Sequence, residues 1–552
     1  MKKKNLFLAA ALALSSAAAH ADEGMWTLYN LPQAVYEQMK SYGFTPSYDQ
    51  LYKSEDAIKN AVVNFSGYCS GVVVSPDGLV FTNHHCGFEA IRSHSTVEHD
   101  YMLNGFYAKT FEEELPNKDM FVSFMVDQKD ITEMLAQRGF NEMNNEQREK
   151  LLNEVENQMI KELHEQDPSL DLEIKPFYEG NKYYATTYRT FRDLRLVFTI
   201  PKSMGKFGGE TDNWMWPRHT CDFSMFRVYA NKDNEPADYS EDNVPMTPKQ
   251  SLKISLKGVN EGDYAMVMGY PGRTQRFQTA SMLEQMIRKQ DVSIAARTLR
   301  QSIMKEGMEA DPAVRLQYAN KYAGSSNGWK KWIGEKKAFE KLNIIGREEQ
   351  KEADFMKWVN ANKKRKAAYG SALTDIKSVI DETSADELAF RLILEAPLNI
   401  GMCNLIGDYA QTLMLKFKAH PEDTAAAFVA AKEAMKGAFK DYYEPLERKL
   451  TAGLLKFYRD NARPSDYPEI EGHDFATMDI DAYVSDLYDH SIFASDEKMQ
   501  NSDIKSFPEF RNDPALALYN AIIAKYSPLY KSLKAANVKL SAGSKAFEAG
   551  LL

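Results

Sequence analysis

The chain has 552 residues, which is enough for two or more domains, each with a core of its own. Its hydrophobic content of 44% and charged content of 26% are those of an ordinary soluble globular protein. Its formal net charge of −10 and the lack of a basic stripe interleaved with aromatic residues argue against a nucleic-acid partner.

The first 21 residues carry the three parts of a bacterial secretory signal in order. Three lysines at positions 2–4 precede the apolar run 6–14, and Ala-His-Ala at 19–21 provides a small-residue cleavage site. We therefore predict a signal peptide over 1–21, cleavage before Asp22, export, and a mature net charge of about −13. No later run approaches the roughly 18 apolar residues that a membrane-spanning helix needs, so the sequence predicts no membrane span.

Short alternating runs bounded by Gly, Pro, Asn and Asp dominate residues 22–274 and predict β-strands. The expected strands are 71–74, 78–82, 120–126, 192–200, 223–229, 251–257 and, as partner of the last, 264–269. One apolar stripe at helical spacing, from Leu151 to Leu163, predicts a helix that is inserted into this part and packs on it.

The pattern becomes helical after the turn Tyr270-Pro271-Gly272, and residues 275–552 are predicted to form a separate all-α domain. Apolar residues at three- and four-residue steps mark helices that include 282–304, 392–394, 413–417, 425–435 and 516–523.

The chain contains four cysteines, and export permits a disulfide. Cys69 and Cys86 lie at the two ends of the hairpin "CSGVVVSPDGLVFTNHHC", where antiparallel strands would bring them close, so we predict that they pair. Cys221 and Cys403 are far apart in sequence, and each could equally be a small buried hydrophobic residue.

His85 is a candidate general base, because it follows a hydrophobic strand and stands directly before a cysteine that would brace its loop. Metal ligation by His84-His85 and a merely exposed loop are the alternatives. His94 and His99 lie near in sequence, but the spacing matches no zinc pattern and a disulfide-bonded cysteine is no ligand.

A base of this kind needs a carboxylate at the start of an apolar strand, where it can hold the imidazole. Asp222 is placed in that way, and Asp212, in the polar turn "GGETDNW", is the rival. The following residues Trp214-Met215-Trp216-Pro217 are typical either of a pocket wall or of a core.

Four stretches resemble one known family: "GYCSGVVVSPDGLVFTNHHCG", "GGETDNWMWPRHTCDFSMFRVYA", "VMGYPGRTQR" and "SSNGWKKW". They are similar to motifs of the bacterial dipeptidyl-peptidases 7 and 11, serine peptidase family S46, and the likeness covers essentially the whole chain after the signal. The resemblance implies a chymotrypsin-like double β-barrel with a large all-α domain inserted into the second barrel. The implied activity is release of dipeptides from the free N-terminus of oligopeptides.

The same resemblance implies roles for single residues. His85 would be the general base and Asp222 its orienting acid in a Ser-His-Asp triad that needs no metal or cofactor. Asn213, with Trp214 beside it, and Asn327 in "SSNGW" would bind the α-ammonium group of the substrate. Cys221 stands where we expect the family to have glycine. A homodimer and a location in the periplasm or at the cell surface of a Gram-negative bacterium are also compatible with the resemblance.

The nucleophilic serine is the missing part. No serine after Asp222 stands in a Gly-Asn-Ser-Gly type turn: "GSSNG" belongs to the recognition motif, "YGSAL" to a helical stretch and "SAGSK" to the tail. We therefore expect an incomplete second barrel, a truncated chain and no hydrolysis by the chain as given. A catalytically silent peptide-binding paralogue and a helical scaffold protein remain as alternatives.

Overall fold

The computed structural model describes residues 26–96, 98–272 and 274–551, and the predicted signal peptide lies outside them. The chain divides into two compact units. Unit 1 comprises the described residues up to 175 together with 183–206 and 221–274, and unit 2 comprises 176–182, 207–220 and the described residues from 275 onward. Two short segments, a hairpin turn with its adjoining strand ends at 176–182 and a connection at 207–220, thus belong to the unit that is otherwise formed by the helices after residue 275.

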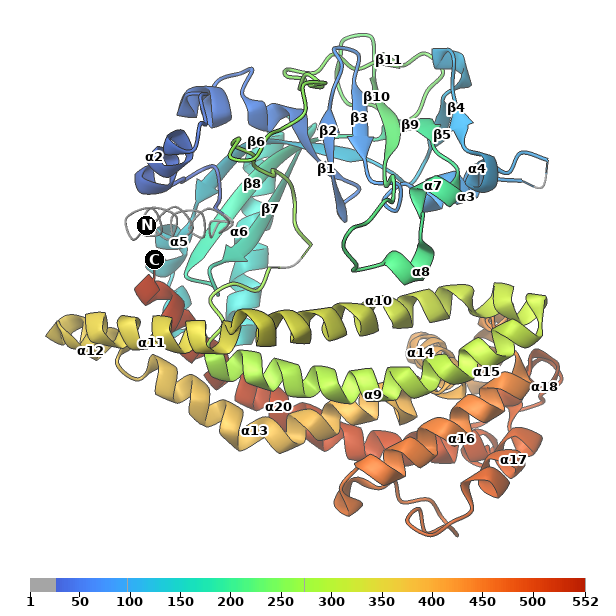
Figure 1. The fold of residues 1–552 in the computed structure, drawn as a ribbon. Coiled ribbons are helices and arrows are strands. Elements are labelled where there is room, and N and C mark those ends of the chain that lie inside the picture. Colours follow the sequence, from blue (N-terminus) through green and yellow to red (C-terminus); the bar gives the residue numbers. More distant parts are fainter. Residues whose placement is uncertain (1–25, 97, 273, 552) are drawn as a thin grey trace, which may run out of the picture. The chain divides into compact units, whose positions relative to one another are not determined.

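The fold is mixed α and β, with an antiparallel sheet and a large helical part, as the sequence predicts at this coarse level (Figure 1). The strands are β1 Val62–Phe65, β2 Cys69–Val73, β3 Leu79–Thr82, β4 Phe106–Tyr107, β5 Leu115–Asn117, β6 Val122–Asp130, β7 Leu170–Phe177, β8 Lys182–Phe191, β9 Asp193–Thr199, β10 Ser224–Ala230 and β11 Val244–Pro245. Within the described residues they form one eleven-stranded sheet of order β4-β9-β10-β3-β2-β1-β6-β8-β7, with β11 on β10 and β5 on β9.

The core of unit 1 lies under the central strands, where apolar residues of β1, β3 and β10 point to the same side. Phe65 and Phe226 meet edge to face at its centre. The charged residues on these strands are paired: Arg227 on β10 donates to Glu114 at 2.8 Å, which offsets the cost of burying both charges.

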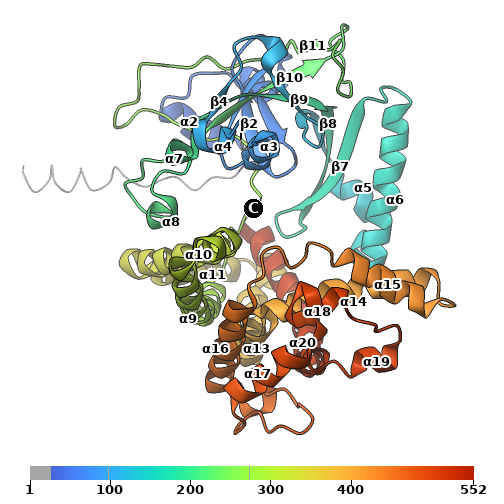
Figure 2. The same ribbon diagram turned by 90° about the vertical axis from the view of Figure 1, so that its right-hand side faces the viewer.

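The helices of unit 1 are α2 Gln33–Ser41, α3 Phe88–His94, α4 Tyr101–Asn104, α5 Thr132–Gln137, α6 Asn145–His164 and α7 Lys202–Gly205. Helix α6 is the one predicted from the Leu151–Leu163 stripe. It begins at a capping box, in which Asn144 accepts from the backbone of Gln147 and Gln147 accepts from that of Asn144. Its apolar side packs on β7 and β8, along which it runs in Figure 2.

Two predicted strands are wrong. Residues 251–257 and 264–269 are irregular, and their apolar side chains face solvent, with Leu256 95% and Val267 99% exposed. Leu252 donates one backbone hydrogen bond to Val73 at the end of β2, but neither segment continues as a ladder. An alternating pattern becomes a strand only beside a partner, and the described residues offer none along these segments.

Unit 2 is helical. Its helices are α8 Gly209–Asp212, α9 Ala280–Ala310, α10 Pro312–Leu342, α11 Ile344–Asn360, α12 Lys363–Tyr369, α13 Ala372–Glu395, α14 Gly401–Ala419, α15 Thr424–Ala434, α16 Glu444–Asn461, α17 Ile480–His490, α18 Asp496–Gln500, α19 Phe507–Arg511 and α20 Pro514–Leu551. Helices α9 and α10 run side by side (Figure 1), and α13 packs on both α9 and α20.

Among the described residues no single helix is long and apolar enough to cross a membrane; the stretches 363–399 and 401–419 pass that test only as a pair bent by 87°.

Candidate active site

The register of β3 and β10 determines where His85 and Asp222 lie. The two strands are antiparallel, and Thr82 at the end of β3 pairs with Ser224 at the start of β10. The residues after Thr82 and those before Ser224 therefore leave the sheet side by side, at the same end of these two strands. The sheet thus brings His85 and Asp222 together although they are 137 residues apart in sequence.

Asp222 binds the loop of His85 through both carboxylate oxygens. Its Oδ2 lies 2.7 Å from Nδ1 of His85, and its Oδ1 accepts from the backbone N–H of His85 at 3.0 Å. Asn83 donates from Nδ2 to the backbone oxygen of Asp222 at 3.1 Å. Burial alone would raise the pKa of Asp222, but the hydrogen bonds from the His85 side chain and backbone outweigh it and lower this pKa.

This geometry suits proton transfer. A carboxylate on Nδ1 holds the imidazole in the tautomer whose Nε2 carries the lone pair, so Nε2 is the atom that can accept a proton. The His85 side chain is 69% exposed and that of Asp222 only 25% exposed, so the base reaches solvent while its partner is sheltered.

His84, the other half of the histidine pair, is buried and serves packing. It is 2% exposed, lies edge-on to Phe88, and has Gly205 directly against its ring. Burial lowers its pKa, so it is held in the neutral form. The pair therefore divides into one inward and one outward histidine.

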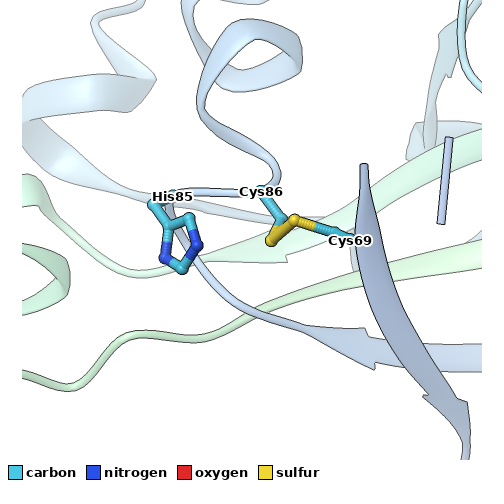
Figure 3. Close-up of side chains that lie close together, drawn as sticks. All are labelled: Cys69, His85 and Cys86. Carbon is cyan, nitrogen blue, oxygen red and sulfur yellow. A yellow bond between two sulfur atoms is a disulfide. The ribbon is translucent and has the colours of Figure 1, made fainter. Parts of the chain in front are cut away.

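Cys69 and Cys86 form a disulfide, as predicted from the hairpin. Cys86 follows His85 directly, and Figure 3 shows the imidazole beside the disulfide. Cys221 is a half-buried free thiol whose backbone N–H donates to Met204. Cys403 is buried, and burial raises the pKa of its thiol to about 12.

Asn213, Trp214 and Asn327 form a second cluster, within unit 2. Oδ1 of Asn327 accepts from Nδ2 of Asn213 at 2.9 Å and from Nε1 of Trp214 at 2.8 Å. Lys330, one turn further along α10, donates to the backbone oxygens of Glu210 at 2.8 Å and of Thr211. Helix α10 therefore fixes the segment that carries Asn213 and Trp214.

The aromatic residues beside Asn213 are not core. Trp214, Met215 and Trp216 are all exposed, Trp216 by 91%. The alternative prediction from the sequence, that these residues belong to a hydrophobic core, is therefore wrong. Trp214 also has a positive φ of 58°, which costs a residue with a Cβ free energy and is often retained at functional sites. Asp212, the rival of Asp222, has its carboxylate against the turn at Gly208.

Ser325 is a residue that sequence reasoning missed. Its hydroxyl accepts from Nη2 of Arg300 at 3.1 Å and from Nε2 of Gln301 at 3.0 Å, and its backbone oxygen accepts from Nη1 of Arg297 at 3.2 Å. All three donors lie on α9, and Arg297 in turn pairs with Glu395 on α13. This buried group, the Ser325 clamp, holds α10 two residues before Asn327.

The clamp explains the neighbouring glycine in "SSNGW". A Cβ on Gly328 would lie 2.8 Å from Nη1 of Arg297, so any larger residue would push this guanidinium away from Ser325. Trp329 donates from Nε1 to Oγ1 of Thr298 on α9 at 2.8 Å. The signal that the sequence offers for this clamp is polar: Arg297, Arg300 and Gln301 stand at three- and four-residue spacing on α9.

Comparison with known proteins identifies the class. The sequence model of the peptidase S46 family matches residues 21–552, and the chain belongs to this family of peptidases. It is 35% identical to dipeptidyl-peptidase 7 of Porphyromonas gingivalis and 36% identical to the Asp/Glu-specific dipeptidyl-peptidase of the same organism. Both alignments cover 100% of this chain and 78% of the relative.

Solved structures agree with the sequence relatives. The crystal structure of Porphyromonas endodontalis DPP11 matches with a TM-score of 0.81 at 32% identity, over 96% of this chain and 77% of that one. The same enzyme in complex with substrate matches with a TM-score of 0.79 at 32% identity over the same shares. This chain is therefore similar, at nearly equal identity, to a relative named dipeptidyl-peptidase 7 and to one named Asp/Glu-specific dipeptidyl-peptidase.

Proposed function

We propose that the chain carries the acid–base and N-terminus-binding parts of a serine-type dipeptidyl-peptidase, which releases dipeptides from the free N-terminus of oligopeptides. The observation that carries the proposal is the 2.7 Å contact between Nδ1 of His85 and Asp222. Nε2 of His85 takes the proton of a serine hydroxyl as that hydroxyl attacks the peptide carbonyl, and then gives it to the leaving amine. Asp222 stabilises the imidazolium that forms between the two steps.

The cluster of Asn213, Trp214 and Asn327 supports the part of the proposal that concerns binding of the substrate's free N-terminus. An exopeptidase must take the substrate's α-ammonium group out of water, and the desolvation is costly unless oxygen acceptors replace the water. Asn213 supplies a side-chain carbonyl, Asn327 holds the Asn213 amide and the Trp214 indole through its own oxygen, and Trp214 supplies an exposed aromatic ring beside them. We assign these three residues to recognition of the free N-terminus.

The nucleophile is the part that the 552 residues do not supply in a recognisable turn, and we propose that this chain alone does not hydrolyse peptides. The serines of "SSNGW" are buried in α10, where Ser325 accepts the two side-chain donors of the clamp. Purified chain should therefore give no release from dipeptidyl reporter substrates. Turnover that disappears in His85→Ala would show that a serine within these residues acts as nucleophile.

Peptide binding tests the remainder of the proposal. The chain should bind an oligopeptide with a free N-terminus at least tenfold more tightly than the same peptide N-acetylated, measured by calorimetry. Asn213→Ala should remove that difference, and the exposed Asn360→Ala should keep it. Equal affinity for both peptides in the wild-type chain would contradict the assignment of the cluster. Selective binding without hydrolysis is also what a catalytically silent peptide-binding paralogue would show.

The finer fold prediction also stays a proposal. We propose that the sheet of unit 1 corresponds to the first barrel of a double β-barrel and that residues 251–269 belong to the second. The exposed alternating side chains Ile254, Leu256 and Val267 are of the kind that a barrel interior would bury. Fast amide exchange over 251–269 in this chain, beside slow exchange in β9 and β10, is the expected result.

We also propose export to the periplasm or the cell surface. The N-terminal signal pattern supports it, and so does the Cys69–Cys86 disulfide, because such bonds persist in oxidising compartments. Expression in a Gram-negative host followed by fractionation should give a mature N-terminus at Asp22 outside the cytoplasm. Retention of the full-length chain in the cytoplasm would contradict the proposal.

A further inference from the structure

The side chains of Cys69, His85 and Cys86, at the start of β2 and in the loop after β3, place metal-ligating atoms close together. The sulfur atoms of Cys69 and Cys86 and a ring nitrogen of His85 all lie within 4.8 Å of one another. Figure 3 shows the imidazole turned toward the two sulfur atoms, with Cys69 approaching from β2 and the other two residues from the loop after β3. In the disulfide the sulfur atoms are bonded to each other and carry no thiolate charge, so they bind no metal in this state.

Reduction changes the chemistry of these atoms. A small dithiol that reduces the bond gives up two electrons and two protons and closes to its own disulfide, which leaves two thiols on Cys69 and Cys86. Each thiol can then release its proton to become a thiolate, the form that binds metal.

We propose that reduction of the Cys69–Cys86 disulfide creates a binding site for a divalent ion of the zinc type, with the two thiolates and Nε2 of His85 as ligands. Zinc binds Cys sulfur at about 2.3 Å and His nitrogen at about 2.0–2.1 Å, so tetrahedral ligand atoms lie about 3.4–3.8 Å apart. The ring nitrogen is already within 4.8 Å of both sulfur atoms, and the sulfur atoms can move apart by side-chain rotation once the bond between them is broken.

The surroundings of His85 favour this use of the ring. A histidine that ligates zinc through one nitrogen commonly donates from the other to a carboxylate, and Nδ1 of His85 already has Asp222 at 2.7 Å. Cys86 is buried while the His85 side chain is 69% exposed, so the fourth position of the metal faces water. The site therefore resembles an open three-ligand site rather than a closed structural one.

Metal bound in this way would occupy the atom that accepts a proton in the proposed peptidase chemistry. The inference itself concerns metal binding and is independent of that chemistry. It is tested by a spectrum rather than by activity, so its failure would leave the proposed function untouched.

Cobalt(II) is the probe, because tetrahedral thiolate complexes of Co²⁺ show charge-transfer bands in the near ultraviolet and d–d bands in the visible. The chain is reduced anaerobically with a small dithiol, freed of it by gel filtration and titrated with Co²⁺. We expect one Co²⁺ per reduced chain with both sets of bands, displacement by Zn²⁺, and no such bands from the oxidised chain. Identical spectra for both forms would overturn the proposal.

Matched variants identify the ligands. His85→Ala is a surface change that should weaken Co²⁺ binding by at least tenfold, whereas the exposed His99→Ala should leave it unchanged. A chain with Cys221→Ser and Cys403→Ser should keep the bands, because those thiols are not ligands. Far-ultraviolet circular dichroism must stay native after reduction; bands that persist in denaturant, or that survive His85→Ala at full strength, would contradict the site.

Discussion

Gly205, at the end of α7, lies so close to His84 that a Cβ on it would be 2.7 Å from Cγ and Cδ2 of the imidazole. His84 is 2% exposed, and its ring also contacts Phe88, so it has little room to move. Because His84 is the neighbour of His85 in a tight loop, this contact helps to determine where His85 stands.

Gly205→Ala should therefore destabilise unit 1 by about 1–3 kcal/mol, the usual cost of overpacking a filled site. We expect a lower thermal midpoint and a shifted His85 resonance in the NMR spectrum of histidine-labelled protein. Gly334→Ala is the control, because a Cβ at that position meets no atom within 4 Å. Equal behaviour of the two variants would contradict the packing role.

Ser325→Ala tests the clamp in unit 2. Removing the hydroxyl leaves the buried donors of Arg300 and Gln301 without their acceptor, which should cost about 1–3 kcal/mol in urea unfolding. Affinity for peptides with a free N-terminus should fall as well, because Asn327 is two residues away. The exposed Ser302→Ala on α9 should change neither. A loss of stability with unchanged peptide affinity would show that the clamp does not position Asn327.

Asp222→Asn should have a pH-dependent effect on stability. The hydrogen bonds from His85 lower the pKa of Asp222 in the folded chain, so its contribution is present above the ordinary pKa of about 3.9 and is lost as pH falls through the lower folded value. The variant should be less stable than wild type by about 1–2 kcal/mol at pH 7, and the gap should close toward pH 3. Exposed Asp233→Asn serves as control; a gap that is as large after Asp222 is protonated, well below its ordinary pKa, as it is at pH 7 would contradict the linkage.

Glu548→Gln should change the stability of the chain with pH in the opposite direction. Burial in α20 and the nearby Glu179 raise the pKa of Glu548 to about 7, although Arg276 opposes the shift. The folded chain therefore favours the protonated acid, and stability is lost as pH rises through 7. At pH 8 the variant should be more stable than wild type by about 1–2 kcal/mol, with no difference near pH 4. Exposed Glu471→Gln should be neutral at both values in thermal unfolding.

The regular elements and the disulfide could be predicted because their signals are local. The Leu151–Leu163 stripe and the hairpin that ends in Cys69 and Cys86 each depend on residues close together in sequence. Residues 251–257 have an equally clear alternation, yet they form no strand, because pairing depends on a partner that the pattern itself cannot show.

The residues of the candidate active site could be predicted mainly from the resemblance to the peptidase family. Local spacing left His85 as one choice among three, and only the register of β3 with β10 shows that Asp222 reaches it. The Ser325 clamp escaped prediction because Arg and Gln on a long helix normally face solvent. Here the partner helix buries them, which is a tertiary effect that composition does not encode.

The hydrogen bond from Trp214 to Asn327 also fixes the direction of two amides. An indole N–H can only donate, so the atom of Asn327 that it meets must be the carbonyl oxygen. The atom of Asn213 that meets the same oxygen must then be its NH₂ group. The carbonyl of Asn213 consequently points away from Asn327, and a cation arriving at this cluster would find its acceptor there, since the oxygen of Asn327 already has two donors.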